Sequence, residues 1–214
     1  MSRVLALAFA VLMLLARPAA ALETAEAEGL VRNAVADATA MFVGGPFSKD
    51  ETRARIHAMV NKYADLPFES ELLLGRYWRK ATPEQQATFA DLLVPFFVAT
   101  YGEMIDGAQD KPSVQFQGAE NQGAQNVVVH SLLVVPGDPE TVKIDWTVTA
   151  TPTGKLIVSD IVADGVGLVT TIKSDFTAVI RGAGGNIEAL FDAMRKKIST
   201  PPSPAVAKQP AAAG

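Results

Sequence analysis

Side chains able to do acid–base or nucleophilic chemistry are scarce in this sequence. It has two histidines, His57 and His130, and no cysteine. Nucleophilic hydrolysis needs a nucleophile, a base and an orienting group, and no G-x-S-x-G motif supplies a serine. His57 falls in a predicted helix and His130 in a predicted strand, and neither has a predicted acidic partner. We therefore interpret both as structural residues and predict that the protein is not an enzyme and has no catalytic residue.

Sites for metals and nucleotides are not predicted either. The two histidines lack the H-x-x-x-H spacing of a zinc-binding helix. The glycine-rich pieces at residues 165–167 and 182–185 lack a G-x-G-x-x-G frame after a strand, so we interpret them as turns. We predict no metal site and no cofactor.

The stretch that gathers most cations and aromatic residues is Leu74–Phe89, LGRYWRKATPEQQATF. Within it Thr82 is a favoured N-cap, Pro83 suits the first helical position, and Gln85 stands three residues after the cap. This pattern predicts a capping box at the start of a long helix that runs to about Ile105. The stretch is therefore predicted to be a joint between two helices. Its cations fall in the last turn of the first helix, where positive charge complements the helix dipole without a ligand.

The elements on either side of this joint follow helical spacing. Apolar residues recur at that spacing from Glu23 to Ile105 and again after residue 168. Gly44-Gly45-Pro46 and Leu66-Pro67 interrupt the first helical region.

Between Ser113 and Val162 the period changes to two, which predicts strands. The clearest run is TVKIDWTVTA, Thr141–Ala150, in which apolar and polar residues alternate. Turn residues at 136–139 and 152–154 separate it from two further runs, which makes the strands antiparallel neighbours. Helices, then a meander, then helices predict an α+β fold: a twisted antiparallel sheet of about four strands with helices packed over one face.

The two ends of the chain differ from this domain in composition. Residues 1–21 are predicted to be a cleaved signal peptide, because Arg3 precedes the apolar run Val4–Ala16 and Ala19-Ala20-Ala21 fits a cleavage site. Thirteen helical residues cover only about 20 Å of the roughly 30 Å hydrocarbon core. Residues 200–214 are rich in Pro and Ala and are predicted to be a disordered tail. Residues 22–199 would then form a single domain.

Charge excludes some classes of partner. The formal net charge is −4, and removal of Arg3 and Arg17 with the signal peptide would make it −6. An acidic chain of this kind is not expected to bind nucleic acid or to adhere to anionic lipid surfaces.

Four stretches taken together resemble a known family. They are LGRYWRKATPEQQATF, FFVATYGEMI, TVKIDWTV and GKLIVSDIVADGVGLVTTIKSDFTAVI. In this order they resemble the MlaC-type periplasmic phospholipid carriers, also called toluene-tolerance auxiliary proteins. The resemblance covers Leu22–Ser199, and the L-G-R-Y-W-R-x-A-T-P-E-Q block followed by D-x-x-x-x-G-V-x-L-V makes it specific.

The resemblance implies a monomeric periplasmic carrier that holds phospholipid as cargo in an apolar cavity between sheet and helices. Its partners would be an inner-membrane ABC transporter complex with a ring of lipid-channel domains and an outer-membrane lipoprotein complex. The implied role is maintenance of outer-membrane lipid asymmetry.

The residues expected to line the cavity are apolar and come from both halves of the chain: Leu73, Phe89, Leu93, Phe96, Phe97, Tyr101, Val129, Val142, Ile144, Trp146, Val148, Val166, Leu168 and Ile172. Arg76, Arg79 and Lys173 are candidates for contact with the lipid headgroup. Pro95 lies inside the long aromatic helix, which is expected over the sheet, and a kink there is a further hypothesis about the shape of the cavity.

Two alternatives stay open. The sequence departs from the family pattern at Leu156, Gly167 and Ile172-Lys173, and a neighbouring branch of the family is associated with hopanoids, so another lipid is one alternative cargo. A periplasmic structural or adaptor protein that binds no lipid is the other.

Overall fold

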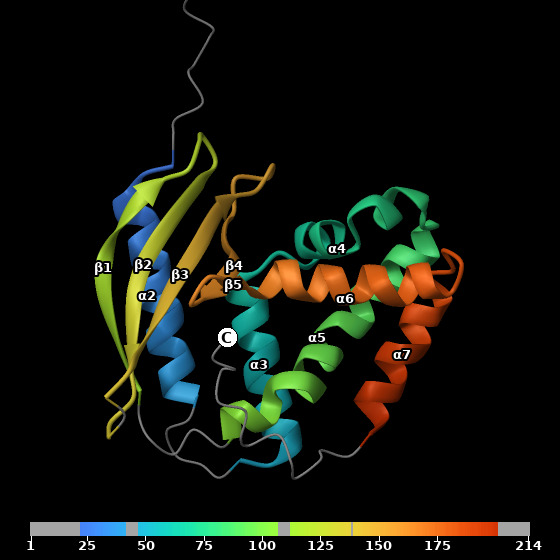
Figure 1. The fold of residues 1–214 in the computed structure, drawn as a ribbon, viewed down its shortest axis with the longest axis horizontal. Coiled ribbons are helices and arrows are strands. Elements are labelled where there is room, and N and C mark those ends of the chain that lie inside the picture. Colours follow the sequence, from blue (N-terminus) through green and yellow to red (C-terminus); the bar gives the residue numbers. More distant parts are fainter. Residues whose placement is uncertain (1–21, 42–46, 107–111, 138, 201–214) are drawn as a thin grey trace, which may run out of the picture.

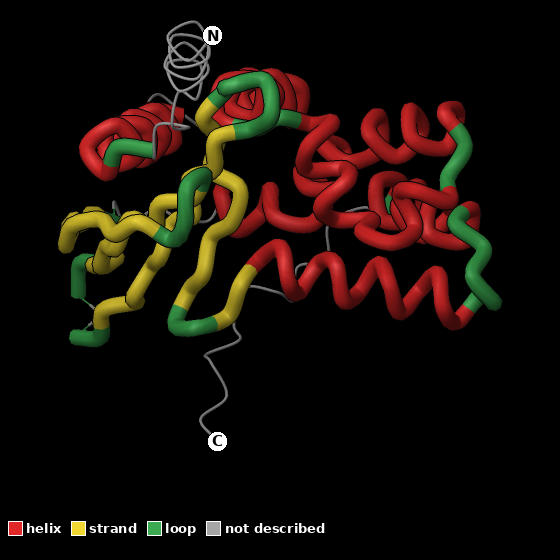
Figure 2. Tube along the Cα trace, turned by 90° about the horizontal axis from the view of Figure 1, so that it is seen from above, coloured by secondary structure: helices red, strands yellow, loops and turns green. Residues whose placement is uncertain are grey.

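The computed structural model describes residues 22–41, 47–106, 112–137 and 139–200. One part is an antiparallel sheet with helix α2 (Thr24–Met41) along one face, and the other part is a group of helices (Figure 1). Seen from above, the strands lie to one side and the helical group to the other (Figure 2). The predicted α+β class is confirmed. The predicted signal peptide, the Gly44-Gly45-Pro46 break and all of the predicted tail except Thr200 lie outside the described residues.

The sheet is a meander with its five strands in chain order. Its strands are β1 (Ser113–Asn121), β2 (Asn126–Val134), β3 (Thr141–Ala150), β4 (Leu156–Ala163) and β5 (Val166–Gly167). Each strand is antiparallel to its neighbour, as short connections require.

The sequence predicts about four strands, and the short strand β5 is the additional one. It consists of two residues, which pair with Val162 and Ala163 of β4. The connecting residues Asp164 and Gly165 have φ of 46° and 84°, the left-handed pair that a two-residue hairpin turn requires. Because two residues are too few for an alternation to be visible, β5 leaves no periodic signal in the sequence.

A first hydrophobic core lies between α2 and the sheet. Val127, Val129 and Val148 are fully buried and pack with Ala27 and Val31 of α2. The register pairs Val127 with Val148 and Val129 with Trp146, so these side chains share one face. The alternation seen in the sequence thus identifies the covered face of the sheet correctly.

A second core joins the helices of the other part. These are α4 (Leu66–Leu74), η1 (Gly75–Lys80), α5 (Pro83–Asp106), α6 (Leu168–Gly182) and α7 (Glu188–Ser199). Phe89 is fully buried where α5, α6 and α7 meet. Its ring makes an edge contact with Phe176 at 5.7 Å between centroids and a tilted one with Phe191 at 6.4 Å.

The predicted joint between helices is confirmed in its local chemistry. The backbone N–H of Thr82 donates to Gln85 Oε1 at 3.1 Å, and the N–H of Gln85 donates to Thr82 Oγ1 at 3.3 Å. These two bonds are the reciprocal pair of a capping box. Tyr77 is buried and Trp78 is partly buried in the helical core, so both aromatic residues of the joint serve packing.

The long helix α5 does not lie over the sheet as expected. It runs on through Pro95 and packs chiefly against α7, with further contacts to α3 (Lys49–Tyr63) and α4. The sheet face is instead covered by α2, which contacts β1, β2 and β4 most extensively. The joint at Thr82 therefore orients α5 within the helical group.

Helix α3 connects the two parts. Its Lys62 Nζ and Tyr63 hydroxyl donate to Asp37 Oδ2 of α2 at 2.6 and 2.7 Å. At the same end, Lys155 Nζ from the β3–β4 turn donates to the carbonyls of Asn61 and Ala64, which end α3. A cation at a helix C-terminus is stabilising because it complements the helix dipole.

Gly75→Ala should lower the free energy of unfolding by about 1–3 kcal/mol. Gly75 has φ 54° and ψ −119°, a conformation that L-residues rarely adopt, and an added Cβ would lie 2.9 Å from Lys173 Cε. The matched control is Gly29→Ala in α2, where no heavy atom lies within 4 Å of the new Cβ. That change should raise stability by about 0.5–1 kcal/mol because Ala is the better helix former. Urea denaturation of both variants measures the difference, and equal stabilities would contradict it.

Candidate functional site

The apolar residues predicted as a binding surface fall into the two cores. Eight belong to the helical core or pack against it: Leu73, Phe89, Leu93, Phe96, Phe97, Tyr101, Leu168 and Ile172. Three belong to or border the sheet core: Val129, Trp146 and Val148. The chain therefore brings most of these residues together as two separate clusters.

The remaining three predicted residues lie apart from both clusters. Ile144 is buried and Val142 is half-buried, both on the sheet face that carries Val148. Val166 lies in β5 and is 65% exposed, the highest value among the large apolar side chains that the structure describes. Its exposure follows from its place in the two-residue strand at the sheet edge.

The aromatic residues that follow Pro95 are the best candidates for contact with an apolar ligand. Phe96, Phe97 and Tyr101 are only half-buried, whereas Phe89 and Leu93 on the same helix are fully buried. Phe97 lies 6.2 Å from Phe96 and stacks on Tyr101 at 5.9 Å between ring centroids. Burial raises the pKa of the Tyr101 hydroxyl, with a smaller effect from the charge of Asp175. The second half of α5 thus carries a row of rings that are only partly covered.

The sheet contributes one aromatic side chain of the same kind. Trp146 is half-buried, and its Nε1 donates to Ser131 Oγ at 2.9 Å. Ser131 Oγ in turn donates to the Ile144 carbonyl at 3.1 Å. Because its polar atom is satisfied within the sheet, Trp146 can offer an apolar ring to a ligand at no cost in hydrogen bonds.

Further half-buried apolar side chains border the two cores without having been singled out in the sequence: Leu30, Val35, Leu66, Leu92, Phe116, Leu156, Val158 and Val169. Helical spacing or strand alternation marks each of them as apolar and inward-facing. The same pattern marks core residues, so periodicity alone cannot tell a border position from a filled one.

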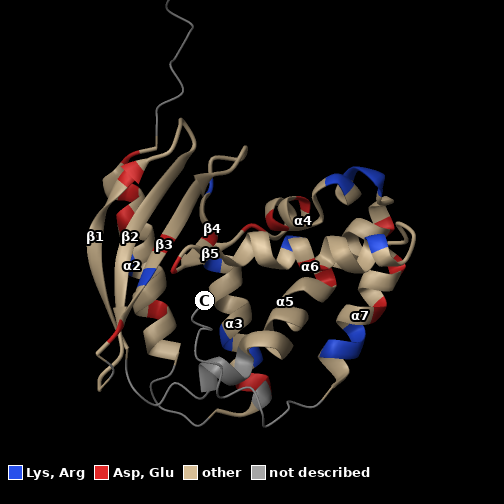
Figure 3. Ribbon diagram, in the orientation of Figure 1, with Lys and Arg blue, Asp and Glu red and all other residues tan. Residues whose placement is uncertain are grey.

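Of the three headgroup candidates, Lys173 lies close to Gly75, and Arg76 and Arg79 lie on the short helix η1 that begins there. Lys173 of α6 reaches Gly75, with Nζ 3.3 Å and Cε 2.9 Å from the position of a Cβ there. Arg76 follows directly, and its guanidinium donates to the Tyr77 hydroxyl at 3.1 Å. Arg79 lies on the same short helix and is exposed. Figure 3 colours lysine and arginine blue, and blue segments lie on α6 and on the stretch that follows α4.

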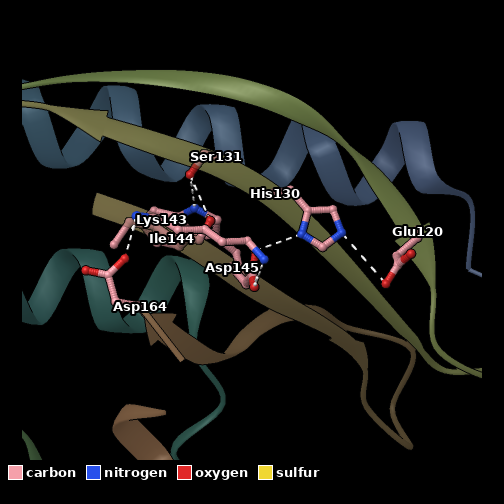
Figure 4. Close-up of polar contacts among 8 residues, drawn as sticks. Glu120, His130, Ser131, Lys143, Ile144, Asp145 and Asp164 are labelled. Atoms are coloured by element: carbon pink, nitrogen blue, oxygen red, sulfur yellow. Dashed lines mark hydrogen bonds and ion pairs between the residues drawn. The ribbon is translucent and has the colours of Figure 1, made fainter. Parts of the chain in front are cut away.

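One of the two histidines has an acidic partner that the sequence did not predict. His57 is exposed on α3, as expected for a structural residue. His130 does have an acidic partner, because the β2–β3 register sets it opposite Asp145, and Nδ1 lies 2.7 Å from Asp145 Oδ1. Its Nε2 lies 3.8 Å from Glu120 Oε1, on the side of the strands away from α2 (Figure 4). Hydrogen bonds from His130 and Lys143 outweigh partial burial and lower the pKa of Asp145.

This histidine cluster lacks the other parts of a catalytic site. Ser131, the neighbouring hydroxyl, points to the opposite face and is bound to Trp146 and Ile144. Within the described ranges, no hydroxyl is hydrogen-bonded to the His130 ring, and no group of three or more His, Asp or Glu is placed to hold a metal ion. We interpret the cluster as cross-strand pairing of charges on the uncovered sheet face.

One buried carboxyl group was not predicted from the sequence. Glu69 of α4 is largely buried, and its Oε1 has no hydrogen-bond partner among the described residues. Burial raises the pKa of Glu69 to about 8, and the charges of Asp160 and Asp65 add to this effect. Asp160 Oδ1 accepts from the Val169 N–H at 3.0 Å and so caps α6 from β4, while Asp65 Oδ1 accepts from Phe68 N–H and caps α4. Periodicity could not reveal this burial, because it depends on segments distant in the sequence.

Comparisons with known proteins give a family match and a similar solved structure. The model of the MlaC protein family matches residues 35–196. A solved structure described as the phospholipid-binding protein from Ralstonia solanacearum, in complex with a phospholipid, superposes with a TM-score of 0.65. The two sequences are 26% identical, and the match covers 80% of this chain and 96% of the other.

Glu69→Gln should change how stability depends on pH. The pKa of the Glu69 carboxyl is about 8 in the folded chain, whereas its ordinary value is 4.5. Between these two pH values the folded state therefore holds a proton that the unfolded state has lost. The free energy of unfolding must therefore fall as pH rises from about 4.5 to about 8, through the ionisation of this group. The glutamine variant removes that loss and should be more stable than wild type above pH 8, on the order of 2 kcal/mol.

Urea denaturation at pH 5, 7 and 9 measures this dependence. The two proteins should be similar at pH 5 and diverge toward pH 9. The matched control is Glu71→Gln, an exposed position on the same helix. Its free energy of unfolding should depend on pH as that of wild type does. Parallel curves for wild type and Glu69→Gln would contradict the prediction.

Proposed function

The chain belongs to the MlaC family, and we propose on that basis that it binds a phospholipid by its acyl chains and carries it between membranes. The observation that carries the proposal is the likeness, over 80% of this chain, to a protein solved with a bound phospholipid. The half-buried rings of Phe96, Phe97 and Tyr101 supply a surface of the matching chemistry.

Half-buried rings are a suitable surface for acyl chains. Each square ångström of apolar surface removed from water contributes about 25 cal/mol, so a helix that leaves three aromatic side chains partly uncovered gains when a lipid covers them. The fully buried Phe89 and Leu93 hold the first half of α5 in the core, while the rings of the second half border that core and stay only partly covered. We propose that the acyl chains lie between this part of α5 and the sheet, against Trp146 and Leu168.

The energetics of lipid transfer support a carrier that is emptied by a partner. Each acyl CH₂ kept from water contributes about 0.8 kcal/mol, so a chain of sixteen carbons represents on the order of 12 kcal/mol. Unaided release into water would be correspondingly slow. We propose that the carrier exchanges lipid with an inner-membrane ABC transporter complex and an outer-membrane lipoprotein complex, and so helps to maintain lipid asymmetry.

The location and size of the carrier follow from the same proposal. Cleavage after residue 21 would deliver residues 22–199 to the periplasm as one lipid-binding domain, with residues 200–214 as a tail. Among the described residues, no helix has both the length and the apolar character needed to cross a membrane. Binding and release of this kind require no covalent step, so the proposed activity is transport rather than catalysis.

Phe97→Asp should reduce the amount of phospholipid that copurifies with the mature chain by about tenfold or more, because a charge among half-buried rings opposes burial of an acyl chain. Val179→Asp on α6 is the matched control, since Val179 is exposed and should tolerate the same change with unchanged lipid content. Solvent extraction and native mass spectrometry measure the lipid, and thermal unfolding shows that each variant is folded. A lipid-free wild-type protein would refute the proposed function, and equal lipid content in both variants would refute the placement of the acyl chains at Phe97.

A further inference from the structure

The contact between α4 and α6 carries opposite charges at its two ends. At the N-terminal ends of the two helices lie the carboxylates of Asp65, which caps α4, and Asp160, which caps α6. At the C-terminal end of α4, Lys173 of α6 lies against Gly75. An anion that approaches this contact is therefore repelled from one end and attracted to the other.

Lys173 has no counter-charge in the fold. The side chain is half-buried, yet no carboxylate of the described residues lies within ion-pair distance of it. Cations elsewhere, such as Lys62 and Lys143, have a carboxylate partner even though they are more exposed. The carbonyl groups that end α4 compensate only part of this charge, since the helix dipole amounts to roughly half an elementary charge.

Two more cations extend this site along η1. The segment is a 3₁₀ helix, in which residues three apart lie above one another at about 2 Å rise per residue. Arg76 and Arg79 therefore share one side of η1. Arg76 is held by the Tyr77 hydroxyl and lies over the Tyr77 ring at 5.0 Å, whereas Arg79 has no ion-pair partner among the described residues.

The apolar core begins directly beside these cations. Ile172 precedes Lys173 and Tyr77 follows Arg76, and both are buried in the helical core. A ligand that fits such a boundary has an anionic group joined to an apolar body. A phosphodiester attached to acyl chains has this chemistry, and guanidinium and ammonium groups are the side chains that bind phosphate best.

We propose that Lys173, Arg76 and Arg79, here named the Gly75 corner, bind the phosphate group of the carried phospholipid. This inference rests on the proposed function and adds to it the residues that bind the headgroup. The corner makes the carrier selective for phospholipid over a neutral lipid with the same acyl chains. Gly75 is required because a side chain there would displace Lys173.

Two short-chain probes test the Gly75 corner: a phosphatidylglycerol and the diacylglycerol with the same acyl chains, which differ only in the phosphate headgroup. Isothermal titration of the lipid-stripped mature chain should show tighter binding of the phosphatidylglycerol. In Lys173→Gln/Arg79→Gln that affinity should fall about tenfold, while affinity for the diacylglycerol stays the same. Arg76 is left in place because it also holds Tyr77.

The control variant is Lys196→Gln/Lys197→Gln, which removes the same charge from exposed residues of α7. It should bind both probes as wild type does, and an equal loss in both double variants would refute the proposal. Wild type that binds the two probes equally would also refute it, with the proposed function intact. Failure to bind either probe would refute the proposed function and the corner with it. Displacement of the phosphatidylglycerol by equimolar glycerol 3-phosphate would assign the corner to free phosphate compounds instead.

Discussion

The edge contact between Phe89 and Phe176 is the interaction on which the helical part depends. Phe89 is fully buried at the point where α5, α6 and α7 meet, and Phe191 completes the cluster. A buried aromatic ring removes a large apolar area from water, so this cluster holds the first half of α5 firmly in place. The second half of the same helix packs at the border of this core, where Phe96 contacts Phe176 while Phe96 and Phe97 stay partly uncovered.

The sheet part has its own hydrophobic core, separate from that of the helices. Helix α2 covers one face through Val127, Val129 and Val148, while the other face carries the His130–Asp145 pair. Two cores that each pack independently leave borders between them, and apolar side chains at such borders are only partly buried. In the proposed carrier function, this arrangement would let a ligand enter between two stable parts without unfolding either. Helix α3, tied to α2 through Asp37 and to the β3–β4 turn through Lys155, keeps the two parts connected.

At the contact between α4 and α6, the signs of the side-chain charges complement the helix dipoles. Carboxyl groups of Asp65 and Asp160 lie at the N-terminal ends, where helix dipoles favour them, and Lys173 lies at the C-terminal end of α4. The net charge of −4 hides this local separation, so the overall acidity of the chain says little about where an anion can bind. The D-x-x-x-x-G-V-x-L-V motif has a structural reason here, since Asp160 caps the helix that Leu168 begins and Gly165 makes the turn between them.

The sequence by itself determined the local structure: the capping box of Thr82 and Gln85, the alternation in β3 and the order of helices and strands all depend on residues a few positions apart. The L-G-R-Y-W-R-x-A-T-P-E-Q and D-x-x-x-x-G-V-x-L-V motifs also sufficed to recognise the family. Only the tertiary structure decided that α5 packs among helices, that Glu69 is buried beside Asp160, and that Lys173 reaches Gly75. The physical reason is that burial and charge pairing depend on distant segments, whereas periodicity reports only that a side chain is apolar and inward-facing, not whether it meets a filled core or a border.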